Sequence, residues 1–170
     1  MNIITMSLLK SFNLMTNISI SIIHQRLYLK TETQSREYII ATSKHGPGEE
    51  KNSYCTPRGQ HLIRAKIGTG QPRGQIFKGR RPTGTVFSAD INDLNGGDWI
   101  LTRILWLSGT EIGKNRLGNV DSMQRYIYIH GVPDELILGI PGSKGCINMS
   151  NNDIEEVFDL VDIGTPVVIE

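Results

Sequence analysis

Cysteine, net charge and long apolar runs are all scarce in this sequence of 170 residues. Two cysteines cannot build the disulfide framework of a small secreted domain, although one disulfide between Cys55 and Cys146 stays possible. A net charge of +1 provides no global basic field, so nothing in it points to nucleic acid. No apolar run approaches the ~20 residues that cross a bilayer, so we expect no stable membrane insertion. No closely spaced cysteine or histidine pairs support a metal site.

Glycine and proline, in contrast, are frequent and separate short apolar runs. The 18 glycines and 7 prolines favour a mainly β fold over a helical bundle, and the length suits one domain. Isoleucine alternates with serine over 18–22, and strands are expected at 25–30 and 36–42 around a turn at 31–35. This opening meander is typical of a β-sandwich. Further strands are predicted at 61–66, 85–89, 99–107, 126–129 and 167–169, between loops at 45–58, 68–82 and 109–122 and a turn at 92–98.

One segment, about 151–161, has the pattern of an α-helix. Ser150 and Asp153 resemble a capping box at its start, and three later residues mark an apolar face. Those residues are Ile154, Val157 and Phe158, with Val161 completing the face. We therefore expect a single short helix that packs against the strands.

Seven basic residues gather in the loop predicted at 68–82 and just before it. They are Arg58, Arg64, Lys66, Arg73, Lys78, Arg80 and Arg81. A solvated surface that protects a sheet edge is the favoured interpretation, and contact with an anionic polymer is the alternative.

The strongest chemical pattern lies between residues 126 and 149. The run Tyr-Ile-Tyr-Ile predicts a strand that ends at His130-Gly131, and Gly145-Cys146 follows behind the glycine- and proline-rich loop 132–142. A thiol with an imidazole base is a nucleophilic pair, and Lys144 adds positive charge that favours the thiolate, so an ion pair near neutral pH is expected. A buried cysteine and a structural histidine are the alternative, and Cys55 is interpreted as a free or buried thiol.

At these residues the sequence resembles the L,D-transpeptidase catalytic domain, also called the YkuD domain. The matching pieces are His130-Gly131 and Ser143-Lys144-Gly145-Cys146-Ile147-Asn148, where the family has a strand ending in His-Gly and then Ser/Thr-His-Gly-Cys. Thr56-Pro57-Arg58-Gly59 resembles an upstream turn of the family, and Gly164 to Ile169 resembles its ending. The resemblance covers most of 16–170, which we take as the catalytic domain after an N-terminal extension at 1–15. It implies a YkuD-type β-sandwich with one short helix after the cysteine.

The resemblance also assigns roles. Cys146 matches the acylated nucleophile and His130 the base. Gly131 matches the residue whose carbonyl orients the imidazole, and Gly145 and Cys146 match the backbone donors of an oxyanion hole. Substrate contacts are expected from Ser143, Lys144 and Asn148. Lys144 departs from the family, which usually has a second histidine there, so substrate choice and rate are open at this position.

The resemblance implies a cysteine-dependent L,D-transpeptidase that acts on peptidoglycan stem peptides or muropeptides through a thioester, without a cofactor. The alternatives are an L,D-carboxypeptidase or amidase on the same substrates, and an inactive relative that only binds peptidoglycan. Lys10 interrupts the apolar run of residues 1–15 and no small-residue cleavage site follows, so no clear signal peptide is visible. We expect a cytoplasmic protein as encoded, or a periplasmic or wall-associated one if the N-terminus is misannotated or export takes another route. Met6 or Met15 is an alternative start. The sequence is silent on oligomeric state.

Overall fold

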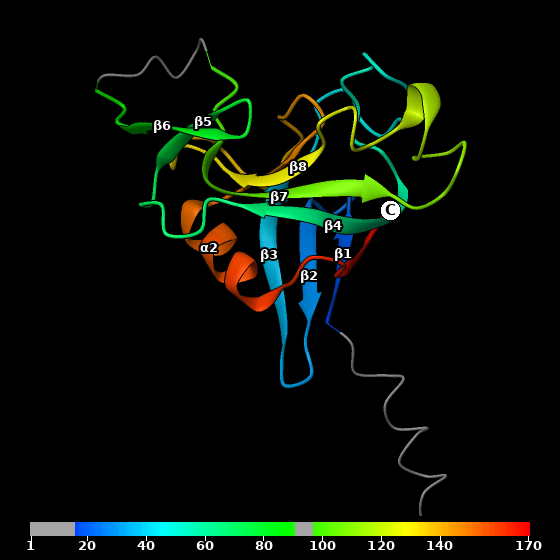
Figure 1. Ribbon diagram of the computed structural model, residues 1–170, viewed down its shortest axis with the longest axis horizontal. Coiled ribbons are helices and arrows are strands. Elements are labelled where there is room, and N and C mark those ends of the chain that lie inside the picture. Colours follow the sequence, from blue (N-terminus) through cyan, green and yellow to red (C-terminus); the bar gives the residue numbers. More distant parts are fainter. Residues whose placement is uncertain (1–15, 91–96) are drawn as a thin grey trace, which may run out of the picture.

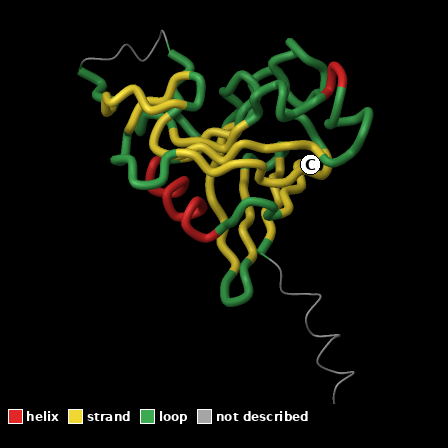
Figure 2. The backbone as a smooth tube through the Cα atoms, in the orientation of Figure 1, coloured by secondary structure: helices red, strands yellow, loops and turns green. Residues whose placement is uncertain are grey.

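The computed structural model describes residues 16–90 and 97–170, which fold into a mainly β domain with the helix α2 (Figures 1 and 2). The predicted extension at 1–15, with its alternative starts, and most of the predicted turn at 92–98 lie outside these residues. The strands are β1 (Asn17–Ser21), β2 (Arg26–Lys30), β3 (Ser35–Ala41), β4 (Gly59–Ile67), β5 (Gln75–Lys78), β6 (Arg81–Val86), β7 (Leu101–Gly109), β8 (Tyr128–Gly131), β9 (Ile147–Met149) and β10 (Pro166–Ile169). The helices are the 3-10 helix η2 (Gly118–Val120) and α2 (Asn151–Leu160).

The strands form one continuous sheet that closes on itself. Its order is β4-β10-β1-β2-β3-β9-β8-β7-β5-β6, and β4 also pairs with β7. Eight strands from β4 round to β7 therefore make a closed ring, with the β5–β6 hairpin attached at β7. The expected mainly β fold with one short helix after Cys146 is confirmed. The expected sandwich differs, because the β4–β7 pairing joins the strands into one sheet rather than two.

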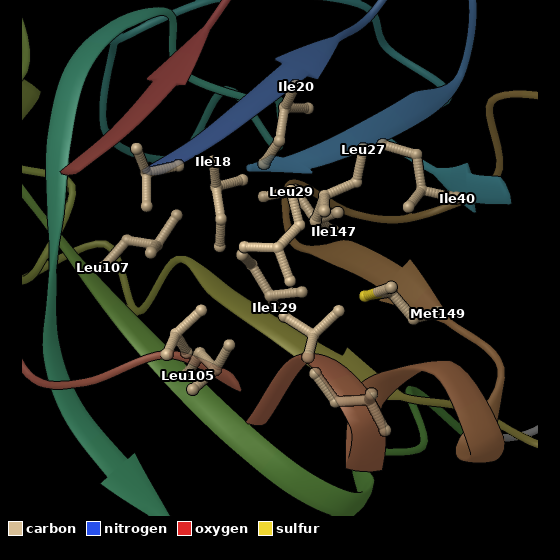
Figure 3. Packing of buried hydrophobic residues seen from close by; sticks show 14 of the residues in the cluster. Ile18, Ile20, Leu27, Leu29, Ile40, Leu105, Leu107, Ile129, Ile147 and Met149 are labelled. Carbon is tan, nitrogen blue, oxygen red and sulfur yellow. The ribbon is translucent and has the colours of Figure 1, made fainter. Parts of the chain in front are cut away.

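The interior of this ring holds the main hydrophobic core. Alternate residues of β1 and β2 point inward, as the sequence pattern predicted, and Ile18, Ile20 and Leu27 are almost fully buried. Figure 3 shows these side chains meeting Leu105 and Leu107 of β7 and Ile129, Ile147 and Met149 of β8 and β9. The inward faces of β8 and β9 are thus fixed by the core, which leaves their other faces for the site described below.

Helix α2 follows the sequence prediction closely. Ser150 is its N-cap, and its hydroxyl accepts a hydrogen bond from the backbone amide of Asp153 at 3.1 Å. Ile154, Val157 and Phe158 are buried in the main core. The helix lies on the same side of β4 and β7 as β1, β2 and β3 (Figure 1), so it anchors the end of β9 to the core.

The segment 68–90 differs from its prediction. Instead of a loop at 68–82 and a strand at 85–89, it contains the β5–β6 hairpin, and β6 ends at Val86. The residues of β6 are all exposed, so no buried apolar alternation marks the strand in the sequence. The hairpin lies across the sheet from α2, on the side that also carries the loops after β3 and β7 (Figure 1). No helix in the described residues is long and apolar enough to cross a membrane.

Candidate active site

His130 and Cys146 lie on the same face of neighbouring parallel strands. β8 pairs with β9 so that Ile129 lies beside Ile147 and His130 beside Asn148. Because Ile129 and Ile147 point into the core, the residues before and after them point outward. This register puts Cys146 next to Tyr128 and one diagonal step from His130, roughly 8 Å between Cα atoms from the strand spacing and rise. The structure therefore brings together the two residues that the sequence pattern singled out.

The imidazole of His130 is held in one orientation and one tautomer. Its Nδ1 lies 2.9 Å from the backbone carbonyl oxygen of Gly131. A carbonyl only accepts, so Nδ1 carries the hydrogen and neutral Nε2 keeps its lone pair. The side chain is 1 % exposed, and burial lowers the pKa of His130 below its usual value, against smaller opposing effects of the Gly131 carbonyl and Asp98. His130 is thus a neutral imidazole whose lone pair is on Nε2.

The thiol of Cys146 is hydrogen-bonded to the first residue of β8 and to the chain just before it. It donates to the carbonyl oxygen of Tyr126 at 3.4 Å and accepts from the amide of Tyr128 at 3.4 Å. Burial raises the pKa of the Cys146 thiol to about 12, an effect that the Tyr128 amide opposes. The sequence suggested a thiolate–imidazolium ion pair near neutral pH. Full burial of His130 and partial burial of Cys146 favour the neutral pair instead, because each charged form loses hydration.

A buried network holds the loop that carries Cys146. The hydroxyl of Ser143 donates to the Cys146 carbonyl oxygen at 2.5 Å and accepts from the Gly145 amide at 3.2 Å. Thr56, in the turn after β3, donates to the Gly145 carbonyl oxygen at 3.0 Å. Gly145 has φ +124°, and a Cβ there would come within 3.2 Å of the Cys55 carbonyl oxygen, so this position requires glycine. The Gly145 amide, expected in an oxyanion hole, already has Ser143 as a partner.

A second network, which the sequence analysis missed, lies beside Gly131. The side chain of Asn151, at the start of α2, donates to the Val132 carbonyl oxygen at 2.9 Å and accepts from the Thr102 hydroxyl at 2.5 Å. Thr102 lies at an irregularity of the β7–β8 pairing with φ +69°, a strained value for a β-branched residue. A Cβ on Gly131 would come within 2.7 Å of Asn151 Oδ1. Asn151 therefore holds the carbonyl of Val132, two residues after His130, and packs closely against Gly131.

A cleft of about 590 Å³ opens beside Cys146. It lies between the β5–β6 hairpin and the loops after β3 and β7. These two loops contact each other, because the Lys51 amide donates to the Asn119 carbonyl oxygen and Arg125 donates to the Glu49 carbonyl oxygen. The charged residues that line it are Lys51, Arg80, Asp98, Arg125 and Lys144. Its aromatic walls are Tyr54, Tyr126 and Tyr128. Cys146 faces this cleft, while the buried His130 lies behind its surface.

The three residues expected to contact substrate occupy different environments. Lys144 is exposed and lines the cleft. Ser143 is 3 % exposed and its hydroxyl is used inside the cysteine loop. Asn148 is 9 % exposed, and its buried Oδ1 has no hydrogen-bond partner in the described residues. Cys55 and Cys146 are both free thiols.

The sequence matches the family model "L,D-transpeptidase catalytic domain", named YkuD, over residues 16–169. This match spans nearly all of the described chain and includes both His130 and Cys146. No curated protein matches the chain.

Solved structures with a similar fold are also L,D-transpeptidases. L,D-transpeptidase 3 from Mycobacterium tuberculosis, in complex with a faropenem-derived adduct, has 18 % identity and a TM-score of 0.56, with 91 % of this chain and 60 % of that chain covered. A mutant of the Enterococcus faecium L,D-transpeptidase has 19 % identity and a TM-score of 0.55, with 91 % and 49 % covered. An L,D-transpeptidase from Mycobacterium smegmatis has 17 % identity and a TM-score of 0.53, with 91 % and 58 % covered. This chain thus spans between about half and three fifths of these structures, and at such identities the likeness concerns the fold.

Proposed function

The chain belongs to the YkuD family of L,D-transpeptidase catalytic domains, and we propose that it is a cysteine-dependent L,D-transpeptidase acting on peptidoglycan stem peptides. The observation that carries this proposal is the arrangement of His130 and Cys146. A thiol faces a cleft, and a neutral imidazole with its lone pair on Nε2 lies on the same sheet face one diagonal step away. This is the pairing of nucleophile and oriented base that acyl transfer to a thiol requires.

The first half of the reaction forms a thioester. Cys146 Sγ bonds to the carbonyl carbon of the amide that joins the L-centre of a diamino acid to a terminal D-Ala. His130 Nε2 takes the thiol proton as the bond forms and passes it to the leaving nitrogen, so D-Ala departs as a neutral amine. A turn of the thiol away from the Tyr126 carbonyl precedes this step, because that carbonyl holds the thiol proton in the free protein.

The second half returns the protein to its starting state. The amine of a second stem peptide attacks the thioester and loses a proton to Nε2, and Sγ leaves and takes that proton back. The product carries a new amide bond, either a cross-link or an exchanged D-amino acid. For the oxyanion formed in each half, the Cys146 amide is the proposed donor, and the Gly145 amide joins it only if it leaves Ser143.

Three other functions stay as alternatives. Water as the acceptor would make the same site an L,D-carboxypeptidase, and another amide would make it an amidase. The third alternative is a protein that binds stem peptides without turnover, which partial burial of the Cys146 thiol favours because it raises the pKa of the thiol. Proton transfer to His130 within the substrate complex is the step that separates the proposed enzyme from this binding protein.

Turnover of a disaccharide-tetrapeptide tests the proposal. Mass spectrometry is expected to show release of D-Ala together with cross-linked dimers, and the Cys146→Ala variant is expected to lose both while keeping its thermal unfolding temperature. D-Ala release without dimers would indicate the carboxypeptidase. Turnover retained in Cys146→Ala would contradict the mechanism.

A further inference from the structure

The tip of the β5–β6 hairpin places one arginine over the candidate active site. Gly79 and Arg80 connect the two strands with φ values of +52° and +64°, as in the two-residue turns that match the twist of a hairpin. Arg80, in this turn, and Cys146 line the same cleft. Sequence patterns placed Arg80 in a general basic cluster and did not distinguish it from its neighbours.

Aromatic rings, rather than an acidic partner, hold the guanidinium of Arg80. Its Cζ lies 4.7 Å from the ring centroid of Trp106 and 4.8 Å from that of Tyr126. Its Nη1 donates to the hydroxyl of Tyr128 at 3.0 Å. Stacking on ring faces leaves the in-plane N–H groups of a guanidinium available, and these groups match a carboxylate in a two-pronged geometry.

Arg80 has no counter-ion among residues 16–90 and 97–170. None of the ion pairs in this part of the chain includes Arg80, and the Tyr128 hydroxyl is the one described acceptor of its five N–H groups. Arg125, by contrast, uses its guanidinium on the carbonyl oxygens of Glu49 and Cys55 and braces the loop after β3. Arg80 is therefore a fixed cation with unused donors.

The charge of the cleft supports an anionic occupant. The whole chain has a net charge of +1, but the cleft has four cationic side chains against the single carboxylate of Asp98. Lys144 is exposed, lines the cleft and lies two residues before Cys146 in sequence. A cleft with one predominant sign attracts ligands of the other.

Tyr126 contacts both Arg80 and Cys146. Its φ of +58° is strained for an aromatic residue. In this conformation its carbonyl accepts from the Cys146 thiol, and its ring stacks on Arg80. Tyr126 therefore contacts both the reacting thiol and the guanidinium to which a ligand group would bind.

We infer that Arg80, supported by Lys144, binds a carboxylate of the substrate, so that the cleft selects stem peptides with free carboxylates over those with carboxamides. This inference rests on the proposed function, since it names the substrate class of the same site. The carboxylate in question belongs to the D-glutamate or to the diamino acid of the stem. The carboxylate of the terminal D-Ala is present in every donor and gives no selection.

Binding to the Cys146→Ala variant measures this selection without turnover. Three disaccharide-tetrapeptides are titrated by calorimetry: one with both carboxylates free, one amidated at D-glutamate and one amidated at the diamino acid. Loss of a charge-assisted contact to arginine is expected to weaken binding of one amidated form by roughly tenfold. In the double variant Cys146→Ala/Arg80→Gln, this difference in affinity should disappear, because only the peptides that retain the carboxylate should bind more weakly. Arg80→Lys, which keeps the charge but not the planar fork, should recover part of it.

Arg81→Gln is the matched control. Arg81 is the next residue in the hairpin, and its exposed side chain forms no hydrogen bond or ion pair with a described residue. It should leave all three affinities unchanged. Equal binding of the three peptides, or an equal loss for all three in Arg80→Gln, would overturn the inference and leave Arg80 as a wall of the cleft. Selective binding without any D-Ala release in the parent protein would sustain the carboxylate site and reject the transpeptidase. D-Ala release without selective binding would support the transpeptidase and reject the carboxylate site.

Discussion

At the scale of single residues, burial acts in opposite directions on the two reacting groups. It lowers the pKa of His130 and raises that of Cys146 to about 12, so each group stays neutral over a wide range of pH. The residue types themselves were predictable from the sequence, because the His-Gly and Gly-Cys pattern is specific. Their protonation states were not, because these depend on burial by residues distant in sequence.

We predict a broad pH profile for kcat/KM. The acid limb reports protonation of His130, and since its pKa is lowered, the midpoint should lie below pH 6.5. The raised pKa of Cys146 should allow activity to persist above pH 9. Initial rates of D-Ala release from pH 4.5 to 9.5 provide the measurement. A fall in kcat/KM between pH 7 and pH 9 would instead indicate an imidazolium that must stay protonated, and would reject the neutral pair.

At the scale of secondary structure elements, the sequence predicted the regular parts and missed the irregular ones. Period-two alternation identified β1, and the N-cap Ser150 identified the start of α2. The β5–β6 hairpin was missed because β5 is short, and β6 is exposed and has no buried apolar alternation. The parallel pairing of β8 with β9 was also beyond local patterns, since it depends on where the closed sheet brings two distant strands together.

The prediction at this scale concerns Asn151, at the junction of α2 with β8. Asn151→Ala removes the side chain that links Thr102 to the Val132 carbonyl oxygen, and leaves both groups without that partner. We expect a loss of about 1–3 kcal/mol in the free energy of unfolding, and a fall in kcat of roughly tenfold because Gly131 no longer holds His130 firmly.

Asn152→Ala provides the matched control for this change. Asn152 is the next residue of α2 and is exposed. Urea unfolding and steady-state kinetics of both variants make the comparison. A stable Asn151→Ala protein with normal kcat would show that the network does not position the imidazole.

At the scale of the whole molecule, two buried neutral histidines make the stability of the closed sheet depend on pH. His61 on β4 donates from Nδ1 to the Gly59 carbonyl oxygen at 2.9 Å and accepts at Nε2 from the Ser122 hydroxyl at 2.8 Å. Burial lowers the pKa of His61, as it does for His130. The unfolded chain therefore binds more protons than the folded chain below pH 6.5, and the folded state loses stability as pH falls.

We expect the free energy of unfolding to decline between pH 7 and pH 5 by up to about 1.4 kcal/mol per pH unit for each buried histidine. Urea titrations at half-unit intervals give the slope. His61→Gln should reduce this slope, and His24→Gln, which alters an exposed histidine, controls for the loss of a histidine as such. A slope that His61→Gln leaves unchanged would show that His61 does not account for the acid sensitivity.

The most direct test of the central claim is the site of acylation. The protein is incubated with a carbapenem, and the mass of the intact protein and of its proteolytic peptides is measured, with Cys146→Ala and Cys55→Ala as a matched pair. A stoichiometric adduct on the peptide that contains Cys146, present in Cys55→Ala and absent in Cys146→Ala, is the predicted result. An adduct on Cys55, or no adduct at any pH between 5 and 9, would contradict the assignment of Cys146 as the nucleophile.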